Sequence, residues 1–199
     1  MDRRKSFFDA AATGWDQLNA GAMQADKLRQ MIDAFAVREG DAILDVGTGT
    51  GILLPFLGKA AGLRGTLVAI DFSLKMLQAA ASHAFDIEPA FLNAGVAAIP
   101  FKAGSFDRVT CFSAFPHFPD KAKALTEMAR VLKAGGALFI AHLHSMEEIA
   151  ELHHGVGGSV RSDRLPGKEA LARLMSEAGL ADIKIENEPG RFLARGSKG

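Results

Sequence analysis

Hydrophobic positions along the chain fall into two alternating patterns, stripes with helical spacing and short continuous apolar runs. Apolar residues from Leu28 to Phe35 recur at i, i+3, i+4 and i+7, which is typical of a helix with one buried face. Similar stripes predict helices that begin near residue 52 and span 74–84 and 125–132, with Ser73 as the N-cap of the second. Between them, short apolar runs predict strands at 42–46, 65–70, 88–92, 106–112 and 136–142. This alternation predicts a doubly wound α/β fold with a parallel sheet.

The pattern changes after residue 142. The region from Ser145 to Pro166 holds two adjacent histidines and a glycine-rich run, from which we expect an irregular loop or lid: His153, His154 and Gly155-Val156-Gly157-Gly158. Residues 171–178 return to helical spacing and end at Gly179. Two short strands, 181–187 and 191–195, flank a Pro-Gly turn and predict a terminal hairpin.

Composition limits the classes of protein that the chain can represent. With 199 residues, 48% of them hydrophobic, it suits one domain of 1–199, with a helical cover at 1–40, a core at 41–142 and the closing elements at 143–199. Lys plus Arg and Asp plus Glu both number 23, so no net charge favours nucleic acid. The lone Cys111 excludes an internal disulfide and thiolate-rich zinc sites. We expect a cytoplasmic protein without a membrane span, since no run of about 18 apolar residues occurs.

A glycine-rich turn follows the first predicted strand. Glycines stand at 47, 49 and 51, between that strand and a helix, where the backbone can pass close under a ligand. The third glycine is out of register with the dinucleotide pattern G-x-G-x-x-G, which weakens the case for pyrophosphate binding. Asp71 ends the second strand, where an acid can accept hydrogen bonds from both hydroxyls of a ribose. Together the turn and the acid predict an adenosine-type ligand.

The chain resembles a known enzyme family, the class I S-adenosylmethionine-dependent methyltransferases of the ubiquinone/menaquinone-biosynthesis type. Four pieces between residues 40 and 142 carry the resemblance: 44–51, 68–77, 99–107 and 130–136. The resemblance implies a Rossmann-like, seven-stranded sheet whose last strand is antiparallel, S-adenosylmethionine as cofactor and S-adenosylhomocysteine as product. It leaves the methyl acceptor open.

The resemblance also implies roles for individual residues. Gly47 and Gly49 pass beneath the methionine part of the cofactor, Asp45 orients its ammonium group, and Asp71 holds the ribose. Phe72 and Met76 flank adenine or, alternatively, only pack in the core. The family's usual acid after the third strand is replaced by Gly95, so adenine is read by backbone at Gly95 and Val96 or by Asn93. The implied cofactor set is Asp45, Gly47, Thr48, Gly49, Gly51, Asp71, Phe72, Met76, Gly95, Val96 and Phe112.

Histidines gather after the fourth predicted strand. Ligands in this fold lie beyond the carboxyl ends of the strands, so we assign His117, His142 and His144 to the acceptor side. His142 and His144 are two apart on an extended segment and are expected to point the same way. Three roles remain open for the histidines: a hydrogen-bonding wall, a general base or metal ligands, and we assign no metal. Cys111 is expected to be buried packing.

The function predicted from the sequence is methyl transfer to a small-molecule acceptor through an O, C, N or S nucleophile. Phe7, Phe8 and Trp15 on the N-terminal segment either shape an apolar acceptor pocket or only pack the cover helix. Phe112-Ser113-Ala114-Phe115 stands where enzymes that methylate nucleic-acid amino groups carry an Asn-Pro-Pro-Tyr-like motif, which argues against base methylation. The alternatives are a non-catalytic module that binds S-adenosylmethionine and a nicotinamide-dependent oxidoreductase.

Overall fold

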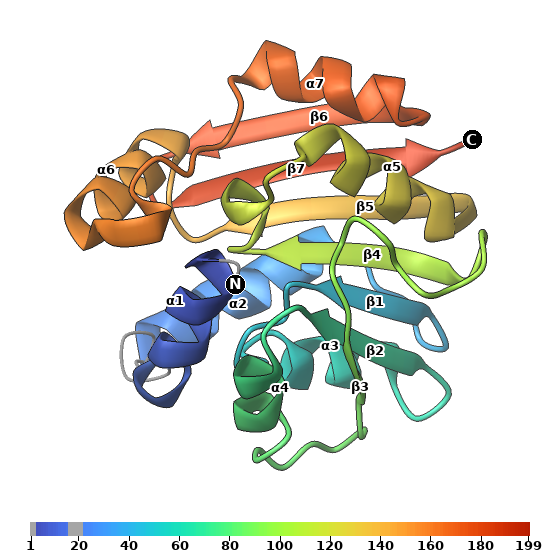
Figure 1. The fold of residues 1–199 in the computed structure, drawn as a ribbon. Coiled ribbons are helices and arrows are strands. Elements are labelled where there is room, and N and C mark those ends of the chain that lie inside the picture. The colour runs from blue at the N-terminus through green and yellow to red at the C-terminus, as the bar shows by residue number, and fades with distance from the viewer. Residues whose placement is uncertain (1–2, 16–21) are drawn as a thin grey trace.

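The protein, described by a computed structural model over residues 3–15 and 22–199, is built on one seven-stranded sheet (Figure 1). The strand order is β3-β2-β1-β4-β5-β7-β6. The strands are β1 (Ala42–Val46), β2 (Thr66–Asp71), β3 (Ala90–Asn93), β4 (Phe106–Phe112), β5 (Leu132–His142), β6 (Leu180–Glu188) and β7 (Arg191–Lys198). The first five pair in parallel, whereas β7 runs antiparallel to both β5 and β6. The doubly wound fold, the antiparallel last strand and the terminal hairpin are confirmed.

Helices cover both faces of this sheet. They are α1 (Arg3–Ala11), α2 (Ala22–Ala34), α3 (Leu54–Ala61), α4 (Leu74–Ala80), α5 (Lys121–Val131), α6 (Met146–Val156) and α7 (Lys168–Glu177), with 3-10 turns η1 (Ala12–Gly14), η3 (Phe115–His117) and η4 (Gly158–Val160). Buried residues of α5 and α7 share one hydrophobic cluster, and those of α2 and α3 share another. Figure 1 shows α1 and α6 beyond the end of the sheet to which β4 points.

Strand β5, which lies inside the sheet between β4 and β7, shows why its apolar positions are continuous along the sequence and not alternating. Leu138 and Ile140 belong to the cluster formed with α5 and α7, while Phe139 and Ala141 belong to the cluster formed with α2 and α3. The Phe139 ring lies 4.9 Å from the ring of Phe35, which directly follows α2. Successive side chains of a strand point to opposite faces, so a strand covered on both sides must be apolar at every position.

Two polar residues in the family-like pieces act as structural clamps. Arg130 on α5 donates hydrogen bonds to the carbonyls of Ile99 and Phe101, at 2.8 Å each, and fixes the segment between β3 and β4. Asp107 accepts from the Ala42 N–H at 2.8 Å and from Lys133 Nζ at 2.7 Å. Arg130 and Asp107 therefore join neighbouring segments of the fold. Both residues lie outside the lining of the main cavity.

The prediction of an irregular loop between Ser145 and Pro166 is wrong for the first half of that region, because α6 occupies residues 146–156. The physical reason is a capping box: Ser145 Oγ accepts from the Glu148 N–H at 3.2 Å, and the Glu148 carboxylate accepts from the Ser145 N–H at 2.6 Å. The glycine-rich run ends the helix at Gly157 instead of opening a long loop. Helix α4 also ends earlier than predicted, at Ala80. Over the described ranges, no helix is long and apolar enough to cross a membrane.

Candidate active site

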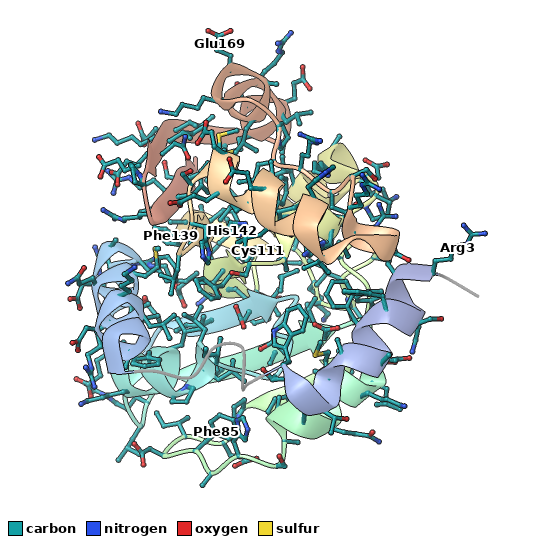
Figure 2. All side chains as sticks on the ribbon, turned by 90° about the vertical axis from the view of Figure 1, so that its left-hand side faces the viewer. Arg3, Phe85, Cys111, Phe139, His142 and Glu169 are labelled. Carbon is teal, nitrogen blue, oxygen red and sulfur yellow. The ribbon has the colours of Figure 1, made fainter. Side chains whose placement is uncertain are left out.

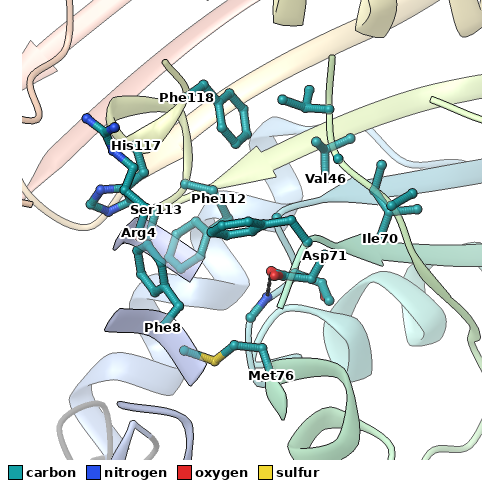
Figure 3. A pocket seen from close by; sticks show the side chains of 18 of the residues that line it. Arg4, Phe8, Val46, Ile70, Asp71, Met76, Phe112, Ser113, His117 and Phe118 are labelled. Atoms are coloured by element: carbon teal, nitrogen blue, oxygen red, sulfur yellow. Dashed lines mark hydrogen bonds between the residues drawn. The ribbon is translucent and has the colours of Figure 1, made fainter. Parts of the chain in front are cut away.

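A cavity of about 400 Å³ opens where the parallel strands β1, β2 and β4 end (Figure 3). Its volume is in the usual range for small-molecule sites. Many residues of the predicted set line it: Gly47, Thr48, Gly49, Asp71, Phe72, Met76, Gly95, Val96, Phe112 and His117. The predicted residues Asp45, Gly51, His142 and His144 are not part of this lining.

The three glycines of the turn serve three different purposes. All have positive φ, at +71° for Gly47, +56° for Gly49 and +82° for Gly51. A Cβ on Gly47 would lie 2.5 Å from the Cβ of Ala114, so this glycine allows the segment after β4 to approach. A Cβ on Gly51 would crowd Leu54 and Ala80, where α3 and α4 meet. Only Gly49 faces open space, since a Cβ there would meet nothing within 4 Å.

Asp71 ties the glycine turn to the start of α4. Its Oδ2 accepts from the Gly49 N–H at 2.9 Å and its Oδ1 accepts from the Ser73 N–H at 2.8 Å. Burial raises the pKa of Asp71, and these backbone hydrogen bonds oppose that rise. Each carboxylate oxygen has more than one lone-pair site, so the group can still accept bonds from a ligand in the cavity.

Asp45 lies beneath the cavity wall instead of in it. The side chain is buried, and Thr110 Oγ1 donates a hydrogen bond to its Oδ1 at 2.7 Å. Burial raises the pKa of Asp45 to about 6, with the Thr110 hydrogen bond opposing the shift. Its neighbour Val46 is the residue at this end of β1 that reaches the lining.

An aromatic and thioether wall forms another part of the cavity lining. Phe8 on α1 lies 5.8 Å, ring to ring, from both Phe72 and Trp15, in edge-on arrangements. Phe8 and the buried Met76 of α4 belong to one small cluster, against which Phe72 and Trp15 pack. The N-terminal helix thus covers the cavity, and its aromatic residues serve both packing and lining.

The edge of the cavity near β3 lacks a carboxylate. Gly95 is exposed there and would meet nothing within 4 Å if it carried a Cβ. Gly95 and Val96 line the cavity, whereas Asn93 donates its amide to the Asp71 carbonyl at 2.8 Å. Asn93 is therefore engaged in joining β2 to β3, and backbone at Gly95 and Val96 faces the cavity.

The three predicted histidines lie in different surroundings. His117, on η3, lines the cavity. His142 is buried at the end of β5 and packs 6.0 Å from the Phe192 ring, near the middle of the molecule (Figure 2). His144 is exposed. The expectation that His142 and His144 share an orientation is wrong, because β5 ends at His142 and the chain bends before α6.

Cys111 and the histidines form no metal site. Over residues 3–15 and 22–199, no group of three or more His, Cys, Asp or Glu side chains is arranged to hold an ion. Cys111 is fully buried in β4, and burial raises the pKa of its thiol well above the ordinary value. It is a packing residue, as the sequence predicted.

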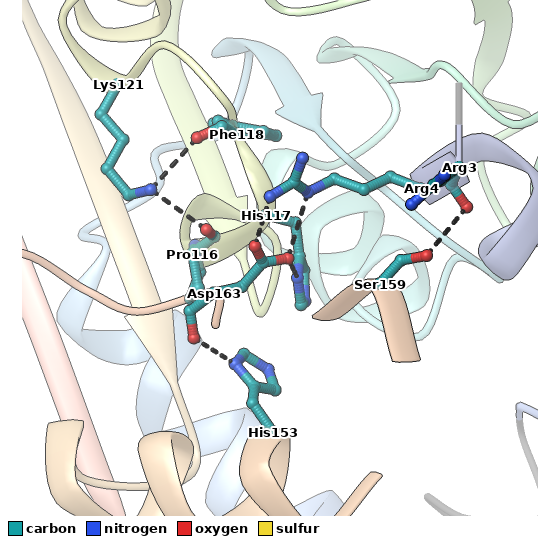
Figure 4. Close-up of polar contacts among 9 residues, drawn as sticks. All are labelled: Arg3, Arg4, Pro116, His117, Phe118, Lys121, His153, Ser159 and Asp163. Carbon is teal, nitrogen blue, oxygen red and sulfur yellow. Dashed lines mark hydrogen bonds and ion pairs between the residues drawn. The ribbon is translucent and has the colours of Figure 1, made fainter. Parts of the chain in front are cut away.

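Sequence reasoning missed two residues of this region, Arg4 and Asp163. Arg4 lines the cavity from α1, and Asp163, which follows η4, accepts hydrogen bonds from both Arg4 and His117 (Figure 4). No local pattern marks Asp163, because His117 is 46 residues away along the chain.

Comparison with known proteins agrees with this geometry. A family profile described as a methyltransferase domain matches residues 44–140. The demethylmenaquinone methyltransferase of Staphylococcus aureus is 31% identical over 83% of this chain and 78% of its own length. The chain belongs to the class I S-adenosylmethionine-dependent methyltransferases of the ubiquinone/menaquinone type. This methyltransferase is also 28% identical to the ubiquinone/menaquinone biosynthesis C-methyltransferase UbiE of Hahella chejuensis, over 90% of this chain and 84% of that protein.

Solved structures support the fold. A methyltransferase from Aquifex aeolicus superposes with a TM-score of 0.71 at 22% identity, over 93% of this chain and 97% of that one. The family membership makes the protein an enzyme that uses S-adenosylmethionine. The residues present fit that cofactor, because the bare backbone of Gly49 opens onto the cavity beside the Asp71 carboxylate.

Proposed function

We propose that this methyltransferase methylates a small aromatic acceptor, of the hydroquinone kind, in the cavity beneath α1. The observation that carries the proposal is the aromatic part of the cavity lining, which includes Phe8, Trp15, Phe112 and Phe118. Aromatic side chains bind flat apolar rings through large contact areas and exclude water. The named activity of the Staphylococcus aureus relative, on demethylmenaquinone, is consistent with such a ring.

We further propose which of the predicted residues bind each part of the cofactor. Gly47, Thr48 and Gly49 hold its methionine part, Asp71 accepts bonds from the ribose hydroxyls, and backbone at Gly95 and Val96 reads adenine. When bound, S-adenosylmethionine supplies a methyl group that is already activated by its sulfonium. Phe72 and Met76 support the purine from one side, and Asp45 and Gly51 shape the turn from behind. This chain then has to align the acceptor and exclude water.

The test measures transfer of labelled methyl groups to defined acceptors. The purified enzyme is incubated with S-adenosylmethionine carrying a radioactive methyl group and with naphthohydroquinone, and the product is separated by chromatography. We expect labelled, ring-derived product, and much less of it with Asp71→Ala when S-adenosylmethionine is below saturation. Labelling of aliphatic amines or carboxylic acids in place of the hydroquinone would show that the acceptor class is wrong.

A further inference from the structure

Two side chains from distant segments meet at the buried carboxylate of Asp163, and a third contacts its backbone carbonyl (Figure 4). His117 Nδ1 lies 2.9 Å from its Oδ2, and Arg4 contacts it twice, with Nη2 2.6 Å from Oδ1 and Nε 3.3 Å from Oδ2. His153 Nδ1 lies 2.7 Å from the backbone carbonyl oxygen of Asp163. Helices α1 and α6 and turn η3 thus converge on one residue.

The chemistry of Asp163 fixes which nitrogen of His117 carries the proton. Burial works to raise the pKa of Asp163, but hydrogen bonds from His117 and Arg4 outweigh it and hold the pKa at about 2. An ionised carboxylate only accepts hydrogen bonds, so His117 Nδ1 must be the donor. A neutral imidazole with Nδ1 protonated has an unprotonated Nε2. The same reasoning makes Nδ1 of His153 the donor to the Asp163 carbonyl.

Arg4 allows His117 to remain neutral in this pairing. Its guanidinium is always charged and already compensates the carboxylate, so the histidine is not needed as a cation. Burial lowers the pKa of His117 below its usual 6.5, the Asp163 hydrogen bond partly opposes this, and the charge of Arg4 adds to the lowering. The result is a histidine that is neutral at neutral pH and held by Nδ1.

Besides its contact with Asp163, His117 contributes to the cavity lining and packs against Phe8. The Phe8 contact is edge-on, with the two rings 5.0 Å apart. Among residues 3–15 and 22–199, Nδ1 is its hydrogen-bonding nitrogen and Nε2 has no partner. A buried aromatic surface on one side and a carboxylate on the other hold the imidazole in a single orientation.

We propose that His117 is the general base of this methyltransferase and that Asp163 is the positioning residue that keeps its Nε2 free for the acceptor's proton. This inference rests on the proposed function and narrows the acceptor to a neutral nucleophile that carries hydrogen. The acceptor atom bonds to the methyl carbon, and the carbon–sulfur bond breaks with its electron pair remaining on sulfur. The proton of the acceptor O–H, or of the methylated ring C–H, passes to Nε2 and then to solvent.

Several charged or titratable groups surround this imidazole and set its pH response. Besides Asp163 and Arg4, they are His153 on α6, whose ring lies 4.7 Å away, and Lys121 on α5, which donates to the carbonyls of Pro116 and Phe118. The buried His142 of β5 also interacts with His117 electrostatically. Turnover should rise with pH through a value below 6.5, as His117 loses its proton.

The deciding measurement is the tautomer of His117, read from nitrogen-15 NMR of the histidine rings in the full chain at neutral pH. The signal is assigned by its loss in His117→Ala. We expect Nδ1 protonated and Nε2 unprotonated in the wild-type protein. In Asp163→Asn we expect both tautomers, because an amide donates as well as accepts. Arg4→Met keeps the carboxylate and should keep Nδ1 protonated.

Activity and binding provide the second arm. With naphthohydroquinone, His117→Ala should lose about 10²–10⁴-fold in kcat. Asp163→Asn should lose at least about tenfold, with the rising limb of its pH profile moved to lower pH. Affinity for S-adenosylhomocysteine should not change in either variant. The matched controls are His83→Ala and the exposed Asp86→Asn, which should behave as wild type.

The outcomes separate this inference from the proposed function. A protonated Nε2 on wild-type His117, which needs no variant to fold, would overturn the inference. So would full turnover by His117→Ala. Failure of the wild-type protein to bind S-adenosylhomocysteine would instead contradict the assigned cofactor site. If that ligand binds and the tautomer is as expected while naphthohydroquinone stays unmethylated, the positioning role is supported and the acceptor class is wrong.

Discussion

The Asp71 carboxylate and the Gly49 N–H, 2.9 Å apart, join the end of β2 to the one glycine of the turn that faces open space. The same carboxylate holds the Ser73 N–H at the start of α4. Its charge therefore lies where a ligand's polar edge would meet the turn, and the geometry of Gly49 depends on it. A substitution of Asp71 should thus change both binding and local order.

We expect Asp71→Ala to weaken binding of S-adenosylmethionine much more than Asp86→Ala does. Hydrogen bonds to a charged group contribute about 1.5–3 kcal/mol each, so loss of the ribose contacts should lower affinity at least about tenfold. Asp86 is exposed and lies outside the cavity lining. Titration calorimetry measures both variants, and equal affinities would remove the ribose assignment. Thermal melting of the ligand-free proteins separates binding from loss of local order.

Alanine at Gly49 and at Gly51 should have different effects. Both substitutions strain a backbone with positive φ. At Gly49 the methyl group enters open cavity space, so cofactor affinity should fall by more than about tenfold. At Gly51 it lies 3.0 Å from Leu54 Cδ1 and 3.1 Å from Ala80 Cβ, so stability should fall by about 1–3 kcal/mol.

Urea unfolding and calorimetry on both glycine variants test this contrast. Gly14→Ala is a suitable control, because a Cβ there meets nothing and its φ is not positive. If Gly51→Ala lost affinity with full stability, the packing role of Gly51 would be incorrect.

Asp45 should make the protein less stable as pH rises from 4 to 7. Its pKa is about 6 when folded, against an ordinary value of 3.8, so the folded state holds a proton that the unfolded state releases. The contribution of Asp45 to stability is greatest below pH 3.8 and declines as pH rises through 6, and the loss amounts to about 3 kcal/mol. Asp45→Asn, which can still accept from Thr110, should abolish this decline. Urea unfolding at both pH values tests it, and parallel pH curves for variant and wild type would contradict it.

His142 should have the opposite dependence at acid pH. Burial lowers the pKa of His142 to about 3. Below pH 6.5 the unfolded chain therefore binds a proton at this residue that the folded protein does not bind. Stability is then lost as pH falls from 6.5 towards 3, by up to about 1.4 kcal/mol per pH unit. The Nε2 of His142 has no hydrogen-bond partner among the described residues. His142→Phe should therefore retain more stability than wild type at pH 5.

The exposed His144 provides the control for this prediction. His144→Ala should match wild type in urea unfolding at both pH 5 and pH 7. Because neither His142 nor His144 lines the cavity, both variants should keep their affinity for S-adenosylhomocysteine and most of their methyl transfer. A large loss of turnover in a well-folded His142→Phe would return that residue to the acceptor side.

The sequence by itself determined the sheet, the glycine turn and the acid after the second strand. These features are local: burial on both faces makes β5 continuously apolar over residues 137–141, and a turn with positive φ selects glycine at 47, 49 and 51. The terminal hairpin was equally readable, because its turn residues lie between two strand-like runs. Such signals depend on residues a few positions apart.

Only the tertiary structure decided which histidine reaches the cavity and what holds it. His117 and Asp163 are 46 residues apart, and Arg4 is 159 residues from the same carboxylate, so no spacing along the chain marks their contact. The bend after His142 and the capping box at Ser145 likewise separated His144 from His142 and replaced the first half of a predicted loop by α6. Pairing between distant segments is set by how the layers pack, and periodicity within one segment reports only which of its faces is buried.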